Sequence, residues 1–422
     1  MAKFKVYIVL ISILIIIGGI FFFYQTTQNP NKTAPEPQVE KSKSKNEETI
    51  KEVEKTTDEK NTDQTIEQKA ETILNKMTLE EKIGQMMVVG FQSSEPDTHI
   101  KKMITKYHVG GVIFYDRNMQ NPKQVAKLTN NLQDLAQESG EEVPLMVSVD
   151  QEGGTIVRMK DKVSPIPSQQ ELGKKNDENL VYETANKTGT ELAAMGINLN
   201  FAPVLDLSTT DSRSFGEDPE KATTFGKRTI QGLADAGVTS ALKHFPGNGR
   251  SNIDPHVETS SVQANKVDLQ NKDIYPFTHI IQDVDNNQFF VMVTHIKYPA
   301  YDKENPASVS SVIMQDLLRQ QLGYKGIIVT DDLEMGAVSK YFTYEDLGAK
   351  AVKSGADVLL VCHTLENQEK VFNGILKEVK NGKISEQQID ESVTRILTYK
   401  LTNDFPLHVD VEQANEKVGN KK

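Results

Sequence analysis

The sequence is poor in cysteine, tryptophan and basic residues. Of its 422 residues one is cysteine, Cys362, and none is tryptophan. A single cysteine cannot form an internal disulfide bond, which excludes a cysteine-rich secreted scaffold and also a zinc site built from thiolates. Lys and Arg number 48 against 59 Asp and Glu, so the net charge is −11. Because nucleic-acid binding needs clustered basic residues, and the sequence has no basic block, we expect no nucleic-acid partner.

Apolar residues are also scarce, and the shortage is local. They make up 37% of the chain, whereas globular proteins have about 45–50%, counted with glycine. Residues 25–66 consist largely of Thr, Lys, Glu, Asn, Gln and Pro. Such a segment cannot bury enough apolar surface to offset the entropy of ordering the chain, so we expect a disordered polar tether there.

One long apolar run precedes this tether, at residues 6–24, and it carries no charge. As a helix it would be roughly 28 Å long, which matches a bilayer core. We expect residues 1–24 to be an uncleaved signal-anchor, with Lys3 and Lys5 keeping the N-terminus in the cytoplasm and the rest of the chain outside. A cleaved signal peptide, giving a secreted protein, and a buried core helix are the alternatives. No cysteine follows the run until Cys362, so a lipid anchor at this position is excluded.

Eight short apolar runs recur between residues 67 and 404. They begin at Met86, Gly110, Leu145, Ile197, Val238, Phe289, Gly326 and Ala356. Each is followed by a stretch with helical spacing, and this alternation is typical of a parallel sheet covered by helices. Eight units predict an α/β fold with a single (β/α)8 TIM-type barrel, with a doubly wound open sheet as the alternative. Residues 405–422 would then form a polar tail.

Ionisable residues gather at the trailing ends of these runs. They are Asp150, Asp206, Lys243, His244, His295 and Asp331. An unpaired charge buried at a strand end costs several kcal/mol, so stability alone does not explain them. The C-terminal ends of barrel strands open into one shared mouth, where active sites lie. We therefore expect these side chains to meet in one site.

Residues 243–256, KHFPGNGRSNIDPH, form a Gly- and Pro-rich loop after a predicted strand. Asp254 and His256 stand two residues apart near its end, where the carboxylate could hold the imidazole and raise its basicity. An incidental histidine in a surface turn is the alternative.

Two further segments carry carboxylates directly after predicted strands. Residues 329–335, VTDDLEM, contain the tandem pair Asp331 and Asp332. Neighbouring side chains on an extended chain point to opposite sides, so we expect only one of the two to face the mouth. Residues 150–158, DQEGGTIVR, place Asp150 before a double glycine that lets a ligand approach the backbone.

Taken in order, six motifs carry a family resemblance. They are DQEGG (150–154), NLNFAPVLD (198–206), SRSFGEDP (212–219), KHFPGxG…DxH (243–256), VTHIKYP (293–299) and VTDDLEM (329–335). The set resembles bacterial glycoside hydrolase family 3, in its β-N-acetylglucosaminidase branch, and the likeness covers essentially residues 67–404. Members of this branch release N-acetylglucosamine from peptidoglycan fragments.

The resemblance implies a role for each matching residue. Asp331 would be the nucleophile that forms a covalent glycosyl-enzyme, and His256, paired with Asp254, would be the general acid/base. The residues implied in sugar binding are Asp150, Arg213, Lys243 and His244, with Arg158 and His295 as helpers. A retaining mechanism needs such a carboxylate and proton donor, and no metal or cofactor is implied.

Four positions depart from the family pattern. In the loop, Asn248, Arg250 and Pro255 replace a histidine, an aspartate and a serine, and Thr155 replaces an arginine after the double glycine. Pro255 fixes its own φ angle, which restricts how the loop can move. We expect catalysis to survive these changes and the leaving-group preference to differ.

The sequence thus predicts a membrane-tethered exo-β-N-acetylglucosaminidase that faces the cell wall, with a carbohydrate and the membrane as its partners. A family 3 glycosidase for another sugar, such as a β-glucosidase, and a phosphorylase are alternatives within enzymes. An inactive wall-sugar binding module is a third alternative. It predicts loss of Asp331, Asp254 or His256, and all three are present.

Overall fold

The computed structural model describes residues 64–251 and 259–419, and its centre is a closed parallel barrel. The strands are β1 (Met87–Val89), β2 (Gly111–Phe114), β3 (Met146–Val149), β4 (Leu199–Asn200), β5 (Thr239–Phe245), β6 (Phe289–Val293), β9 (Ile328–Asp332) and β10 (Val358–Val361). Their order around the barrel is β1-β10-β9-β6-β5-β4-β3-β2, and β1 pairs with both β10 and β2. The predicted (β/α)8 barrel is confirmed, because a doubly wound sheet would leave two open edges.

Each barrel strand coincides with one of the eight predicted apolar runs, and nearly all strand residues are buried. Strands that pack inward on the barrel interior and outward on helices are apolar on both faces, which explains the continuous runs. A short antiparallel hairpin, β7 (Lys297–Tyr298) with β8 (Asp302–Pro306), interrupts the pattern after β6.

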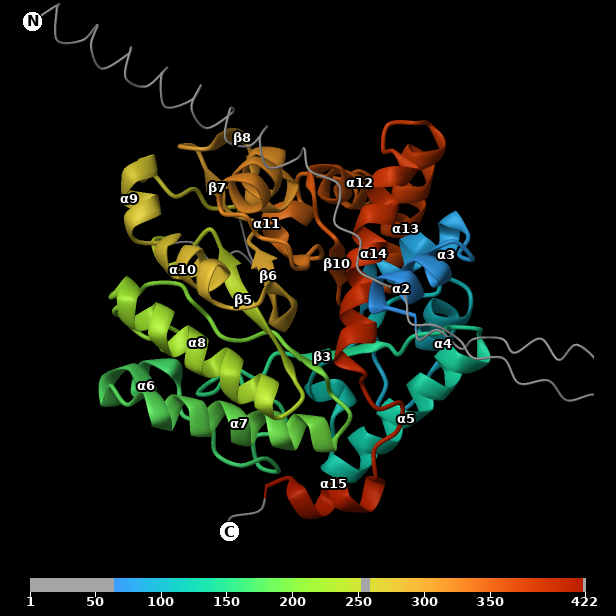
Figure 1. Cartoon of the computed structure of the whole chain (residues 1–422), viewed down its shortest axis with the longest axis horizontal. Coiled ribbons are helices and arrows are strands. Elements are labelled where there is room, and N and C mark those ends of the chain that lie inside the picture. Colours follow the sequence, from blue (N-terminus) through green and yellow to red (C-terminus); the bar gives the residue numbers. More distant parts are fainter. Residues whose placement is uncertain (1–63, 252–258, 420–422) are drawn as a thin grey trace, which may run out of the picture. The chain divides into compact units, whose positions relative to one another are not determined.

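Helices surround the barrel (Figure 1). They are α2 (Ile66–Leu74), α3 (Leu79–Gln85), α4 (Thr98–Thr105), α5 (Pro122–Glu138), α6 (Gln169–Lys175), α7 (Glu178–Ala194), α8 (Pro219–Asp235), α9 (Lys266–Asn271), α10 (Tyr275–Asp283), the π-helix η4 (Val312–Gln321), α11 (Gly336–Ser339), α12 (Tyr344–Ser354), α13 (Leu365–Lys380), α14 (Glu386–Asn403) and α15 (Val411–Lys417). Local sequence sets many of their starts. Asn121 caps α5 and Asp218 caps α8, each just before a proline at the first helical position.

Residues 405–422, expected as a polar tail, contain the helix α15, which packs against α5 and α7. Ala414 and Val418 are buried, and Asn130 of α5 bonds the backbone of Val409 in both directions, at 2.9 Å each. These buried apolar residues give the short helix one face that packs on its neighbours.

The expected membrane segment and almost all of the expected tether lie outside the described residues; of the tether, only residues 64–66 are described. Thr65 caps α2, which begins at Ile66. Within residues 64–251 and 259–419, no helix combines the length and the apolar character that a membrane crossing requires.

Candidate active site

A polar cavity of about 810 Å³ opens at the C-terminal ends of the barrel strands. Six of the nine predicted site residues line it: Asp150, Arg158, Arg213, Lys243, His244 and Asp331. Asp254 and His256 belong to residues 252–258, outside the described residues. His295 is the remaining one, and it does not line the cavity.

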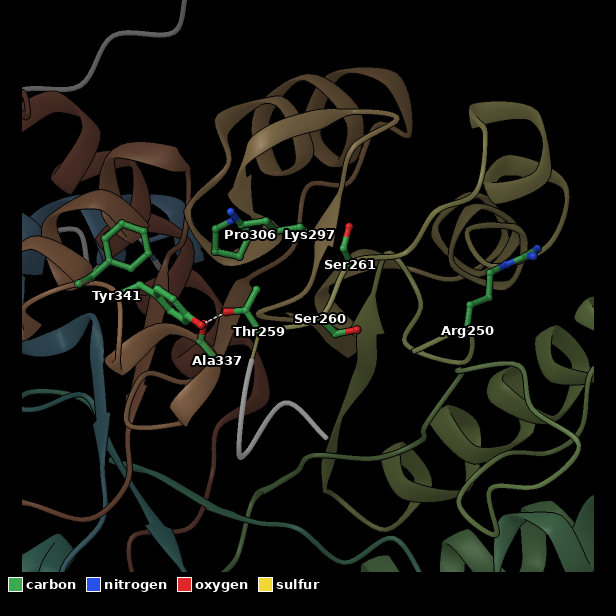
Figure 2. Close-up of a pocket in the computed structure, with 9 residues that line it drawn as sticks. Arg250, Thr259, Ser260, Ser261, Lys297, Pro306, Ala337 and Tyr341 are labelled. Atoms are coloured by element: carbon green, nitrogen blue, oxygen red, sulfur yellow. Dashed lines mark hydrogen bonds between the residues drawn. The ribbon is translucent and has the colours of Figure 1, made fainter. Parts of the chain in front are cut away.

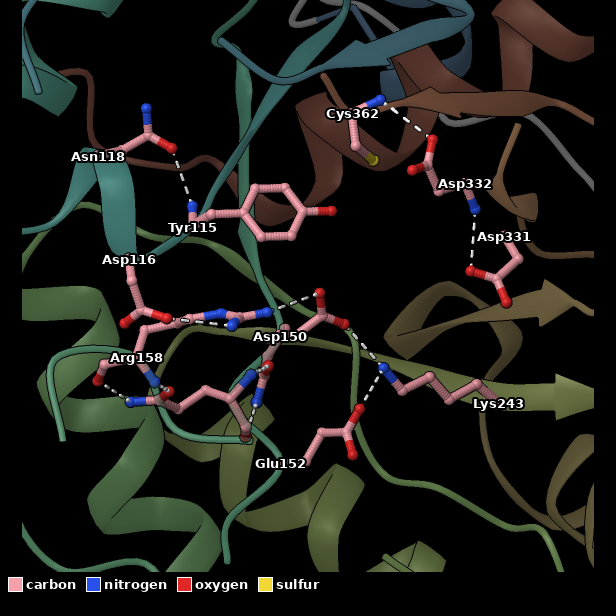
Figure 3. Close-up of polar contacts among 12 residues, drawn as sticks. Tyr115, Asp116, Asn118, Asp150, Glu152, Arg158, Lys243, Asp331, Asp332 and Cys362 are labelled. Atoms are coloured by element: carbon pink, nitrogen blue, oxygen red, sulfur yellow. Dashed lines mark hydrogen bonds and ion pairs between the residues drawn. The ribbon is translucent and has the colours of Figure 1, made fainter. Parts of the chain in front are cut away.

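Two cations of the cavity, Lys243 and Arg213, are held by Glu152, a buried carboxylate that the sequence analysis did not select. Its Oε1 lies 2.6 Å from Lys243 Nζ, and its two oxygens accept from Arg213 Nε and Nη2 at 2.7 and 2.8 Å. Lys243 Nζ also lies 2.8 Å from Asp150 Oδ1, so the ammonium sits between two carboxylates (Figure 3). Burial opposes ionisation of Glu152, but Lys243 and Arg213 lower its pKa to about 2. Glu152, Lys243 and Arg213 are therefore charged at neutral pH.

Arg158 joins this network from the loop after β3. Its Nη2 lies 3.6 Å from Asp150 Oδ2, and its Nη1 lies 3.3 Å from Asp116 Oδ2. The guanidinium also lies over the ring of Tyr115, 5.1 Å from its centroid, while Arg117 approaches the same ring at 4.5 Å. The ring of Tyr115 thus helps to fix the Arg158 guanidinium at the cavity wall.

The tandem carboxylates at the end of β9 both reach the cavity wall, but their partners differ. Asp332 Oδ1 accepts from the backbone N–H groups of Glu334 and Cys362, each at 3.1 Å, and its Oδ2 lies 3.3 Å from His363 Nε2. Among residues 64–251 and 259–419, the Asp331 carboxylate accepts one hydrogen bond, from the backbone N–H of Asp332 at 2.9 Å. Asp332 is therefore a structural anchor, and Asp331 keeps an oxygen for chemistry.

Asp331 is ionised in this environment. Burial would raise the pKa of its carboxyl, but His244, His295, the Asp332 amide and Lys243 together hold that pKa below its usual value. An anionic carboxylate in a cavity of this polarity is the form that a nucleophile requires.

His244 forms a second buried pair, with Asp206. Its Nδ1 lies 2.7 Å from Asp206 Oδ2, and both side chains line the cavity. Burial raises the pKa of Asp206, but His244 and the backbone amides of Asn248 and His244 lower it to below the usual value.

His295, predicted as a helper in sugar binding, is fully buried behind the wall. Its Nδ1 lies 2.7 Å from Ser308 Oγ, and its Nε2 lies 2.8 Å from the carbonyl oxygen of Asp332. Burial lowers the pKa of His295. It supports the backbone that carries the two aspartates rather than contacting a ligand in the cavity.

The start of the loop that carries Asp254 and His256 is firmly held. Tyr298, fully buried, donates to the carbonyl of Gly247 at 2.7 Å, and Arg250 Nε donates to Asp273 at 2.8 Å. Arg250 and residues 259–261 also line a second cavity of about 560 Å³, where the guanidinium of Arg250 points away from the other labelled side chains (Figure 2). Asp273 is thus the partner that explains arginine at this position.

Within the described part of the chain, no three His, Cys, Asp or Glu side chains are grouped as metal ligands. Glu152 and Asp206 are the functional residues that sequence reasoning passed over or left unassigned. Their positions in the motifs DQEGG and FAPVLD marked both carboxylates as candidates. Their roles could not be predicted, because their partners come from other parts of the chain.

Comparison with known proteins gives one family. The model of the glycosyl hydrolase family 3 N-terminal domain matches residues 78–399. Beta-hexosaminidase from Hydrogenovibrio crunogenus is 34% identical over 316 residues, which cover 71% of this chain and 86% of that protein. Beta-hexosaminidase A from Pseudoalteromonas piscicida is 30% identical over 388 residues, which are 82% of this chain but 64% of that protein, slightly less than two thirds.

Among solved structures, a family 3 beta-N-acetylglucosaminidase from Paenibacillus superposes with a TM-score of 0.75 at 37% identity, over 81% of this chain and 69% of that one. The predicted family is therefore confirmed by sequence and by fold. The chain belongs to glycosyl hydrolase family 3, and it is a glycoside hydrolase.

Proposed function

We propose that this protein is a retaining exo-β-N-acetylglucosaminidase. The observation that carries the proposal is the ionised Asp331 carboxylate in the cavity that Asp150, Lys243 and His244 also line. Relatives named beta-hexosaminidase and the Paenibacillus beta-N-acetylglucosaminidase support the choice of sugar.

In the proposed reaction Asp331 attacks the anomeric carbon, and the bond from that carbon to the leaving oxygen breaks. His256, paired with Asp254, gives a proton to the leaving oxygen. Water then attacks the glycosyl-enzyme, His256 takes a proton from it, and the Asp331 carboxylate is released. The hydrogen bond from the Asp332 amide holds one oxygen of Asp331, so the other can point at the sugar.

The charged residues of the cavity bind the sugar in this proposal. Asp150 accepts from sugar hydroxyls, while Lys243, Arg213 and Arg158 donate to hydroxyl and acetamido oxygens. Hydrogen bonds in which one partner is charged are roughly twice as strong as neutral ones. A small number of fixed charges can therefore select a neutral sugar.

The charge of the cavity favours water over phosphate as the acceptor of the glycosyl group. Its carboxylates are Asp150, Glu152, Asp206, Asp211, Asp331 and Asp332. Its lysine and arginine residues are Arg158, Arg213 and Lys243. Each of these three cations is already paired with a carboxylate, so an incoming phosphate would meet net negative charge.

The deciding experiment compares the full chain on aryl β-N-acetylglucosaminide and aryl β-glucoside, with and without inorganic phosphate. We expect faster turnover of the N-acetylglucosaminide, a rate that phosphate does not raise, and free N-acetylglucosamine as the product. A better rate on the glucoside would contradict the sugar assignment. Formation of N-acetylglucosamine 1-phosphate would identify a phosphorylase.

Peptidoglycan fragments as the natural substrate, and a position at the cell membrane facing the wall, complete the proposal. The uncharged run at residues 6–24 and the polar stretch that follows it support this location. An enzyme held on the outer face of the membrane by such a segment would meet wall-derived glycans.

A further inference from the structure

Asp206 is a buried carboxylate that follows the strand β4. It contacts His244 of the neighbouring strand β5 and the backbone of Asn248 in the loop after β5. Its Oδ2 lies 2.7 Å from His244 Nδ1. Its Oδ1 accepts from the backbone N–H of Asn248 at 2.7 Å and from that of His244 at 3.2 Å. The exposed fractions of the two side chains are 6% for Asp206 and 8% for His244.

Backbone pairing beyond the strand β4 brings these groups together. The N–H of Leu205 donates to the carbonyl of Lys243 at 2.6 Å, and the N–H of Lys243 donates to the carbonyl of Pro203 at 3.2 Å. Asp206 therefore stands beside His244 and beside the first residues of the loop 245–251. One carboxylate contacts a ring and two amides that lie in the cavity wall.

The protonation state of Asp206 determines which nitrogen of His244 carries a hydrogen. Because the pKa of Asp206 is held below its usual value, the carboxylate is ionised at neutral pH and can only accept hydrogen bonds. The Nδ1 of His244 must therefore donate. In the neutral ring Nε2 is then an acceptor, and no bond to Nε2 is found among residues 64–251 and 259–419.

We propose that Asp206 is a positioning residue for the glycosidase reaction, because it fixes the Nδ1–H form and the orientation of His244. His244 then presents Nε2 as an acceptor for a hydroxyl of the sugar. This inference rests on the proposed function, since it assigns the partner of one sugar-binding residue.

The test is Asp206→Asn in the full chain, read first by the nitrogen chemical shifts of His244. We expect the Nδ1–H form in the wild type. In the variant the amide can donate to Nδ1, so we expect the Nε2–H form to appear. We also expect kcat/KM on aryl β-N-acetylglucosaminide to fall on the order of a hundredfold, because a misplaced contact group costs about that much.

A double-mutant cycle separates an effect through His244 from general damage. If Asp206 acts through the ring, Asp206→Asn should lower kcat/KM by no more than about twofold in a His244→Gln background. Asp273→Asn is the matched control, because Asp273 holds Arg250 in the same loop but does not line the cavity. We expect it to lower the melting temperature and to leave the Nδ1–H form of His244 unchanged.

Three outcomes would each overturn the proposal. In the first, the losses of kcat/KM in the two single variants multiply in the double variant. In the second, the His244 tautomer is unchanged in Asp206→Asn, and in the third Asp206→Asn keeps full activity. Should Asp206→Asn fail to fold, Asp206→Glu keeps the charge and must retain the Nδ1–H form with a smaller loss of kcat/KM; the other tautomer would again overturn it. The tautomer readout needs no turnover. If the wild type were inactive on all aryl glycosides, the proposed function would be contradicted. The tautomer of His244 would still test whether Asp206 positions the ring.

Discussion

Glu152 shows how a charged cavity can be built without uncompensated charge. Lys243 and Arg213 would repel each other at close range, and the buried carboxylate between them removes that cost. With Asp150 added, the two cations face two anions. The chain can therefore hold strong donors at the cavity wall in positions that a sugar can use.

Asp331→Asn tests the nucleophile. We expect kcat on aryl β-N-acetylglucosaminide to fall on the order of a thousandfold or more, because the neutral amide cannot form the glycosyl-enzyme. Steady-state kinetics with circular dichroism of the folded variant measure this. Asp332→Asn is the matched comparison, and we expect it to lower the melting temperature more and kcat less, since Asp332 anchors the Glu334 and Cys362 amides. If Asp332→Asn is the inactive variant, the assignment within the pair is wrong.

His256→Ala tests the proton donor. A good leaving group departs without protonation, so we expect the variant to lose far more activity on alkyl than on nitrophenyl β-N-acetylglucosaminides. The ratio of the two losses, measured as kcat/KM, is the readout. Equal losses on both substrates would count against His256 as the acid.

At the scale of elements, the apolar runs located every barrel strand but extended beyond several of them, and furthest beyond β4. The run at residues 197–206 predicts a strand up to Asp206, whereas β4 ends at Asn200. Pro203 has no N–H to donate to a ladder, and the chain instead pairs only locally with β5 through Val204 and Lys243. This departure from regular pairing is what places Asp206 beside His244.

The helix α14 carries a buried lysine that makes stability depend on pH. Lys400 Nζ donates to Gln85 at 2.8 Å, and burial lowers the pKa of Lys400 to about 8. In the unfolded chain the pKa is about 10.4, so between these values the unfolded state binds more protons and stability rises with pH.

We therefore expect the wild type to gain about 2 kcal/mol of unfolding free energy relative to Lys400→Met between pH 8 and pH 10. Urea denaturation at several pH values measures the difference. Lys380→Met, which removes an exposed lysine paired with Glu80, is the control and should show little pH dependence. A constant difference between the wild type and Lys400→Met would contradict the lowered pKa.

At the scale of the whole molecule, closure of the barrel decides what the site contains. Asp150 follows β3, Lys243 and His244 lie on β5, and Asp331 lies on β9. These strands meet only because β1 pairs with β10 and closes the ring.

The proposed membrane anchor is tested on the full chain. We expect it to sediment with membranes and to resist extraction by high salt, because a run of about 19 apolar residues spans the bilayer core. Deletion of residues 6–24 should release an enzyme with unchanged activity into the soluble fraction. A full chain found in the soluble fraction, shortened after residue 24, would identify a cleaved signal peptide instead.

The sequence by itself determined the order of strands and helices, the family, and six residues that the structure brings to one cavity. Hydrophobic periodicity and sequence motifs suffice for these, because both are properties of short stretches of chain. Only the tertiary structure decided their partners. In the folded barrel Glu152 pairs with Lys243 and Arg213, and Asp206 pairs with His244. His295 is fully buried and does not line the cavity. Those pairings join residues far apart in the chain, and their energies depend on burial and distance, which exist only after the barrel has closed.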